Sequence, residues 1–247
     1  MDNSISPPVE TSFEEAHSQR FPWINVGLFG LTCLSTMIVG TFLMAGFTDT
    51  LGSGAGSFMR SILRNPSMLL HGLPFSVAIM TILLAHEMGH YLTCRYYGIS
   101  ASLPYFIPAP TIVGTMGAFI RIRSPIHHRS ALLDVGIAGP IAGFVLAIPA
   151  LFIALGQSRF VVPNPAESFG FGEPLSFKAA EAIMGMTPPP GMDLYLHPIG
   201  LAAWFGFFAT ALNLLPVGQL DGGHIAYALF GRFHKKISQG FLFFLIP

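Results

Sequence analysis

The sequence predicts an all-α polytopic integral membrane protein with about four transmembrane helices, a re-entrant loop or β-hairpin, and a further helix truncated at the C-terminus. Hydrophobic residues make up 52% of the 247 residues, charged residues make up 10%, and the mean hydropathy is +0.61. Soluble domains are about 25% charged, so 12 basic and 12 acidic side chains could hardly cover a water-facing surface. The balanced charge predicts no nucleic-acid partner, and the 23 phenylalanines exclude a disordered chain.

Four apolar stretches are long enough to cross about 30 Å of hydrocarbon. Three of them cover residues 23–47, 73–94 and 131–155, and the fourth runs from residue 198 toward residue 221 across helix-breaking residues. Residues 241–247 are apolar but too few to span, so we expect them to begin a fifth helix that continues beyond the chain. We therefore expect two parts. Residues 1–22 form a flexible cytoplasmic tail, and residues 23–247 form a membrane-embedded domain that is incomplete at its C-terminus.

Residues 96–120 contain no charged side chain, yet they are not expected to form a regular spanning helix. Three prolines between residues 104 and 110 remove backbone donors and interrupt a helix. Residues 111–123 are rich in β-formers around two glycines, which favours a short hairpin there. We expect a re-entrant loop that packs on the preceding helix. The alternative is a fifth spanning helix of the short, broken kind.

The distribution of basic residues predicts the orientation in the membrane. On a four-helix count, eight lysines and arginines lie on the side of the N-terminus and four on the other side, which places the N-terminus in the cytoplasm. The first 22 residues carry four acids and one arginine, and they fit neither a secretory signal nor an organellar transit peptide. We expect a multi-pass protein of the bacterial cytoplasmic (inner) membrane.

The second apolar stretch contains the ionisable run His86-Glu87-Met88-Gly89-His90. Residues four apart share one face of a helix, so His86 and His90 can bind one metal ion, and Glu87 can take a proton from a metal-bound water. A carboxylate in an apolar helix is costly unless it is paired, so its presence indicates a function. The alternative is a histidine pair satisfied by neighbouring helices, such as a proton relay.

A catalytic zinc usually takes three protein ligands, so a third buried polar residue is needed. Asp221 is the best candidate, because it follows the helix-breaking run of residues 213–220 in an otherwise apolar region. Asp134 competes, but its charge is explained by its place near the start of the third stretch. His224 could face the same way as Asp221, and we expect it at the rim of the site rather than among the ligands.

Gly139 and Gly143 lie in the third apolar stretch, on either side of Pro140. Small residues let the backbones of two membrane helices approach each other. These glycines therefore predict a close helix contact or a local kink.

Taken together, the motifs resemble the site-2 protease family of intramembrane zinc metalloproteases. The resemblance rests on H-E-M-G-H at residues 86–90 and N-L-L-P-V-G-Q-L-D-G at residues 213–222. Residues 114–121 and 139–143 extend it, so that it covers roughly residues 70–230. The paired motifs are highly specific, because either alone would occur by chance far more often.

The resemblance implies a zinc-dependent endopeptidase that cleaves peptide bonds within or near the transmembrane segments of membrane proteins, in signalling or in membrane-protein turnover. It implies one Zn²⁺ per chain, held by His86, His90 and Asp221. It also implies Glu87 as general base and Asn213 in contact with the substrate or the oxyanion. The family commonly presents an edge strand to an unwound substrate, and residues 111–123 would match that role.

Two other functions use the same residues. A polytopic metal or proton transporter could bind its cargo with the His/Glu/Asp cluster, although such proteins often have repeated halves and neither motif occurs twice. A non-catalytic binder of membrane proteins could keep the protease fold, although every expected catalytic residue type is present.

Overall fold

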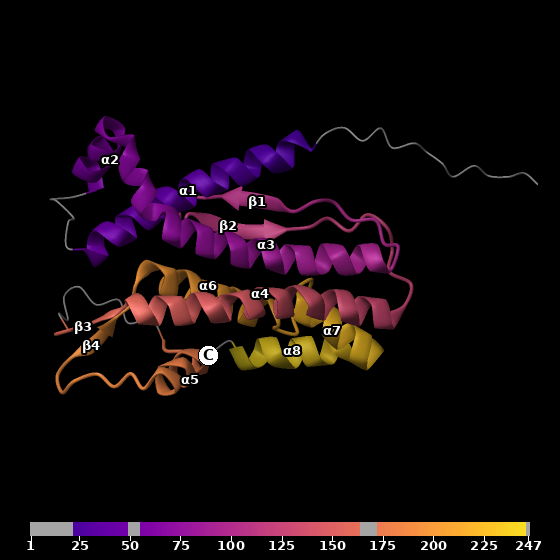
Figure 1. Ribbon diagram of the computed structural model, residues 1–247. Helices are drawn as coiled ribbons and strands as arrows, with labels where there is room; N and C mark the ends of the chain where they lie inside the picture. The colour runs from indigo at the N-terminus through magenta and orange to yellow at the C-terminus, as the bar shows by residue number, and fades with distance from the viewer. Residues whose placement is uncertain (1–21, 49–54, 164–171, 246–247) are drawn as a thin grey trace, which may run out of the picture.

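The computed structural model describes residues 22–48, 55–163 and 172–245, and this part of the chain is mostly helical (Figure 1). Its α-helices are α1 (Trp23–Phe47), α2 (Ala55–Arg64), α3 (Leu73–Tyr96), α4 (Arg129–Gln157), α5 (Leu175–Met184), α6 (Pro198–Asn213), α7 (Asp221–Phe230) and α8 (His234–Leu245). Two 3₁₀ helices, η1 (Pro66–Gly72) and η2 (Gly231–Phe233), precede α3 and α8. Apart from Pro22, the tail predicted at residues 1–22 lies outside the described residues.

Three described segments are long and apolar enough to cross a membrane. They are residues 23–47, 66–96 and 129–157, so the first three predicted spans are confirmed by length and composition. α4 keeps its helical path although Pro140 and Pro149 lie inside it. Prolines are tolerated in membrane helices because neighbouring groups can satisfy the freed carbonyls. The chain is therefore an integral membrane protein.

The fourth predicted span takes a different form. α6 begins at Pro198 as expected, but it ends at Asn213 after 16 residues, or about 24 Å at helical rise. Pro216 has no backbone N–H to continue the helix, and Gly218 has φ +56°, so a new helix starts only at Asp221. The predicted break is confirmed, whereas a count of four spanning helices stays a prediction. The apolar residues 241–245 belong to α8.

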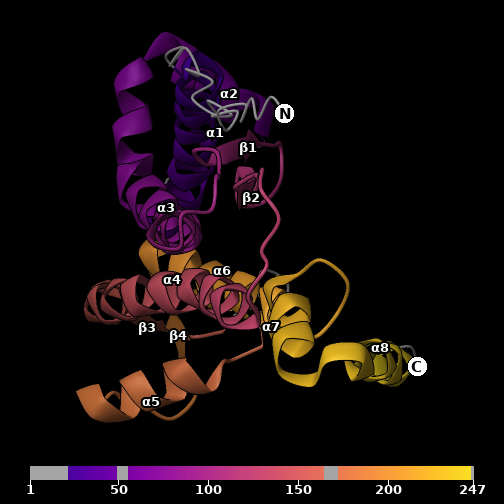
Figure 2. The ribbon, with the colours of Figure 1, turned by 90° about the vertical axis from the view of Figure 1, so that its right-hand side faces the viewer.

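The helical core is built from α3, α4 and α6, which lie against one another (Figures 1 and 2). Ile82 of α3, Ala147 of α4 and Phe207 of α6 belong to one buried cluster. The helices approach closely because small residues line the contact. A β-carbon on Gly206, for example, would lie 2.8 Å from Ile82 Cγ2.

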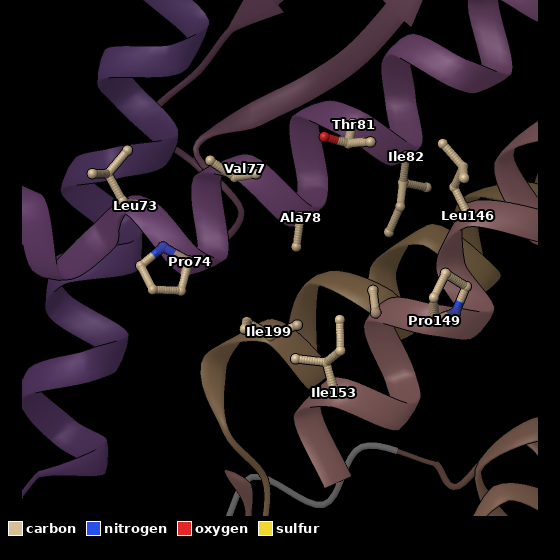
Figure 3. Close-up of a pocket in the computed structure, with 11 residues that line it drawn as sticks. Leu73, Pro74, Val77, Ala78, Thr81, Ile82, Leu146, Pro149, Ile153 and Ile199 are labelled. Atoms are coloured by element: carbon tan, nitrogen blue, oxygen red, sulfur yellow. The ribbon is translucent and has the colours of Figure 1, made fainter. Parts of the chain in front are cut away.

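An apolar groove of about 500 Å³ opens between α3, α4 and the start of α6 (Figure 3). Thr81 supplies the one polar side chain among the described residues that line it. None of the described residues that line this groove is ionisable.

The predicted hairpin is present, but its first strand lies earlier in the chain than expected. β1 (Tyr105–Pro108) pairs antiparallel with β2 (Thr115–Phe119), with Tyr105 opposite Phe119. Residues 111–114 form the turn rather than a strand. Prolines precede β1 and end it, where a missing N–H costs few ladder bonds. The alternative of a broken spanning helix at residues 96–120 is wrong.

A second two-stranded ribbon lies between the C-terminal end of α4 and the beginning of α6. β3 (Arg159–Val161) pairs antiparallel with β4 (Asp193–Tyr195), and α5 lies between them in sequence and packs on α4 through buried Phe177. The motif residues 86–90 contact α4 between Val135 and Gly143, whereas this ribbon begins after α4 ends at Gln157.

Candidate metal centre

α3 places the three ionisable side chains of the H-E-M-G-H motif inside the protein rather than toward lipid. His86, Glu87 and His90 are only 6%, 6% and 7% exposed. The helix contains no charged residue upstream of this motif, and it ends six residues after His90, just beyond Arg95. His90 therefore lies about 9 Å inside the end of an apolar helix at helical rise.

Glycines on α4 make room for the two imidazoles. A β-carbon on Gly139 would lie 2.1 Å from His90 Nε2, and one on Gly143 would lie 3.2 Å from His86 Cβ. Gly89, the glycine of the motif, in turn lets the backbone of α4 approach α3. A β-carbon at this position would lie 2.4 Å from the Ala138 carbonyl oxygen. The close helix contact predicted from Gly139 and Gly143 is confirmed, and it occurs at the histidines.

The break between α6 and α7 brings Asp221 to the same place. Asp221 is the first residue of α7, so its side chain points from a helix start toward α3. The two glycines that follow are needed for this turn. A β-carbon on Gly222 would lie 2.1 Å from the Leu214 carbonyl oxygen, and one on Gly223 would lie 2.4 Å from that of Gly218. The Asp-Gly-Gly sequence thus folds tightly over the end of α6.

The donor atoms of His86, His90 and Asp221 form a nearly equilateral triangle. The two Nε2 atoms are 3.2 Å apart, and each lies 3.3 Å from Asp221 Oδ2. Zinc bonds of about 2.0–2.1 Å at tetrahedral angles separate neighbouring ligand atoms by about 3.3–3.4 Å. Among the described residues, this is the group of three His, Cys, Asp or Glu side chains that could hold a metal ion.

The hydrogen bonds of His90 and Asp221 leave lone pairs of both side chains directed at the centre of the triangle. His90 Nδ1 lies 2.7 Å from the Val135 carbonyl oxygen and can reach it only as the N–H donor, so Nε2 of the neutral ring presents its lone pair. Asp221 Oδ2 is buried and accepts no hydrogen bond within the described structure. Lone pairs that converge without a proton between them fit a bound cation, and nitrogen and oxygen ligands of this kind fit zinc.

Two further side chains border the donor triangle. The amide nitrogen of Asn213, the last residue of α6, lies 3.2 Å from His86 Nε2. Glu87 lies beside the triangle rather than in it, with His90 and Asp221 as its charged neighbours. The backbone N–H of Ile120, the residue directly after β2, faces its carboxylate. All five predicted site residues are therefore brought together.

The two competing residues lie outside the triangle. Asp134 is exposed on α4 and accepts a hydrogen bond from the Tyr97 hydroxyl, so it is not placed to bind a metal with the histidines. His224 is exposed one turn after Asp221 and contributes no donor atom to the group, as expected for a residue at the rim. Sequence reasoning missed the backbone groups of Val135 and Ile120, because no side-chain pattern marks them.

Comparison with known proteins gives one family and several plant relatives. The sequence model of peptidase family M50 matches residues 74–244. The chain is 32% identical over 217 residues to "Probable zinc metalloprotease EGY2, chloroplastic" of Arabidopsis thaliana, an alignment that covers 85% of this chain and 36% of the relative. The Oryza sativa subsp. indica protein of the same name is 35% identical over 225 residues, with 88% and 38% covered.

A third relative is a further plant protein. "Probable zinc metalloprotease EGY1, chloroplastic" of Arabidopsis thaliana is 34% identical over 166 residues, which cover 65% of this chain and 30% of the relative. The chain thus spans less than two-fifths of the length of these curated relatives.

Proposed function

The chain belongs to peptidase family M50, and from this premise we propose that it is a zinc-dependent endopeptidase that hydrolyses peptide bonds within or beside the transmembrane segments of membrane proteins. The observation that carries the proposal is the donor triangle, with edges of 3.2 to 3.3 Å, buried between helices long enough to span a membrane. An intramembrane cluster of ionisable residues indicates a functional site, because lipid does not solvate it.

His86, His90 and Asp221 would hold one zinc ion. When bound, zinc polarises a carbonyl oxygen and lowers the pKa of water toward neutrality. The Val135 carbonyl keeps the His90 ring in the tautomer that binds metal through Nε2. Because Gly139 and Gly143 lack side chains, both imidazole rings pack tightly between α3 and α4. This packing would preorganise the two ligands for the metal.

Glu87 is proposed as the general base. It is buried beside the ligands but is not one of them, so its carboxylate is free to take a proton from the attacking water and to pass it to the leaving amine. The backbone N–H of Ile120 orients this carboxylate. We propose that the Asn213 amide, which lies 3.2 Å from His86 Nε2, donates a hydrogen bond to the oxyanion that develops on the scissile carbonyl.

The β1–β2 hairpin is proposed to receive the substrate. A helical substrate hides its peptide bonds and must unwind before cleavage, which leaves backbone groups unpaired in an apolar environment. A strand edge satisfies these groups by main-chain pairing. Because β2 leads directly to Ile120 at Glu87, a substrate strand on this hairpin would run past the general base.

The membrane context completes the proposal. Eight basic residues against four favour a cytoplasmic N-terminus, and α6 is proposed as a short fourth span despite its 16 residues. The relatives are named chloroplastic, so a bacterial inner membrane stays a prediction from the sequence alone. Membership of a peptidase family argues against the transporter and against a chain that only binds membrane proteins.

Zinc content and cleavage test the function together. Detergent-purified protein that has not met a chelator should hold about one zinc per chain. His86→Ala and Asp221→Ala should lose it, whereas His224→Ala at the rim should keep it. Glu87→Gln should keep zinc and lose cleavage of a tagged reporter that carries one transmembrane segment. Full zinc content in Asp221→Ala would disprove the ligand set, and cleavage by Glu87→Gln would disprove the general base.

A further inference from the structure

α1 lies outside the part of the chain that matches the family, because the match begins at residue 74. Nevertheless, α1 packs along the hairpin. It contacts β1 along its length, while β2 lies on the side of α3 (Figure 1). The rings of Phe29 of α1 and Phe106 of β1 pack edge to face with their centroids 5.1 Å apart, and Phe106 is only 2% exposed. The hairpin is therefore attached to a helix that the family match does not cover.

Asn25 holds the beginning of the hairpin. Its side-chain amide donates to two carbonyl oxygens, those of Leu103 and Pro104, each at 3.0 Å. These two residues directly precede β1, so neither oxygen lies within the β1–β2 ladder. Asn25 lies in the first turn of α1 and is half-buried, and both hydrogen bonds of its amide go to the segment that leads into the hairpin.

Ser35 holds the other end of the hairpin. Its hydroxyl donates to the Gly114 carbonyl oxygen at 2.6 Å, in the turn before β2. The backbones also touch, since Gly114 has φ +81° and a β-carbon there would lie 2.7 Å from the Ser35 carbonyl oxygen. Ten residues separate Asn25 from Ser35, about 15 Å of helix, so α1 grips the hairpin at two distant points.

These two attachments determine where the chain passes Glu87. β1 and β2 are in a defined register, with Phe106 opposite Ala118, so fixing β1 and the turn also fixes the end of β2. The next residue is Ile120, whose N–H faces the Glu87 carboxylate. A shift of the hairpin along α1 would move this amide away from the carboxylate.

We propose that Asn25 and Ser35 are positioning residues. They hold the hairpin against Glu87, so that a bound substrate strand lies beside this carboxylate. This inference rests on the proposed function, because it assigns the hairpin to the substrate. Neither residue touches the donor triangle, so zinc binding does not depend on them.

The alternative is that the two side chains only hold α1 in the protein. Thr41 provides a matched control on the same helix. Its buried hydroxyl donates to the Met37 carbonyl oxygen of α1 at 2.8 Å and lies 3.4 Å from the carbonyl oxygens of Met68 and Leu69 in η1. Within the described residues it has no hydrogen bond to the hairpin. Thr41→Val removes this polar contact of α1 with η1 without touching the hairpin, whereas Ser35→Ala removes a hydrogen bond that holds the hairpin.

The experiment compares four variants of the full chain in detergent: Asn25→Leu, Ser35→Ala, Ser35→Thr and Thr41→Val. Hydrogen–deuterium exchange of residues 105–119, zinc content, and the KM and kcat for the tagged reporter are measured for each. Asn25→Leu and Ser35→Ala should speed exchange of the hairpin amides about five- to tenfold, as expected for loss of ordinary hydrogen bonds. KM should rise by a similar factor while zinc content stays constant. Ser35→Thr, which keeps a hydroxyl, should restore the wild-type values.

Three results would overturn the proposal. The first is unchanged exchange of residues 105–119 in both loss variants, and the second is faster exchange with an unchanged KM. The third is an equal rise in KM for Thr41→Val, which would show a general effect of loosening α1. If wild type cleaves no reporter, the proposed function fails by itself, whereas the exchange data still decide whether Asn25 and Ser35 hold the hairpin.

Discussion

Gly139 of α4 lies so close to the His90 imidazole that a β-carbon on this glycine would stand 2.1 Å from Nε2. Real β-carbons do not approach other heavy atoms so closely. The ring occupies the space that any larger residue would fill. The position of a candidate metal ligand on α3 therefore depends on the absence of a side chain on α4.

Gly139→Ala should abolish zinc binding, because the imidazole would have to leave the donor triangle. Gly143→Ala should have a smaller effect, since its β-carbon would lie 3.2 Å from His86 Cβ. Gly156→Ala in the same helix is the control, because its nearest neighbour is a flexible methionine methyl group at 4.0 Å. Zinc per chain by atomic emission distinguishes the three. Equal zinc in Gly139→Ala and Gly156→Ala would show that the helices can separate.

Removal of zinc should lower the thermal stability of the protein, because it leaves Asp221 Oδ2 buried without a hydrogen bond. A ligand at 100 times its Kd contributes about 2.7 kcal/mol to folding. We expect chelation to lower the Tm by several degrees and added zinc to restore it. Asp221→Ala has no carboxylate to satisfy, so its Tm should respond little to either treatment. An identical response in that variant would place the stabilising zinc at another site.

Asn213→Ala should reduce kcat without reducing zinc content. Loss of one donor to a developing oxyanion typically costs about 3 kcal/mol, or about 100-fold in kcat. Because Asn213 is half-buried at the end of α6, its removal leaves no large cavity. Turnover of the tagged reporter at saturating concentration measures the effect. A large loss of zinc instead would mean that Asn213 mainly supports His86, 3.2 Å away.

His197 should make folding sensitive to acid. It precedes α6 and caps it, with Nδ1 accepting from the Ile199 N–H at 3.3 Å, and burial lowers its pKa. Protonation removes the acceptor and is favoured in the unfolded chain. The stabilisation is thus present above the unfolded pKa of about 6.5 and is lost as the pH falls below it.

His197→Asn provides the comparison for this prediction, since asparagine caps a helix well and does not titrate. Thermal melting of both proteins from pH 8 to pH 5 should show Tm falling further in wild type than in the variant. Parallel curves would mean that other groups cause the acid sensitivity.

Local sequence was sufficient for the features that depend on neighbours along the chain. The spacing of His86 and His90 places both on one helix face, whatever surrounds that helix. Pro216 and Gly218 end α6 because of their own backbone restrictions, and the break was foreseen for that reason. The three long apolar helices were likewise predictable, since spanning hydrocarbon requires only length and hydropathy.

The hairpin shows where that reasoning failed. The β-formers and glycines of residues 111–123 predicted the hairpin there, but its first strand lies at residues 105–108, among prolines. β1 forms because α1 supplies partners that sequence patterns do not reveal, namely the Asn25 amide and the Phe29 ring. Tertiary contacts outweighed local preference.

The sequence by itself therefore established a membrane protein with a histidine pair and a nearby carboxylate on one helix, because these properties follow from helical geometry and hydropathy. It favoured Asp221 over Asp134, and only the fold shows that Asp221 lies beside the histidines while Asp134 pairs with Tyr97. The backbone contacts of His90 with Val135 and of Glu87 with Ile120 arise only when distant segments meet. Every residue carries the same N–H and C=O groups, so only the packing of α1, α3, α4 and the hairpin determines which of them serve the site.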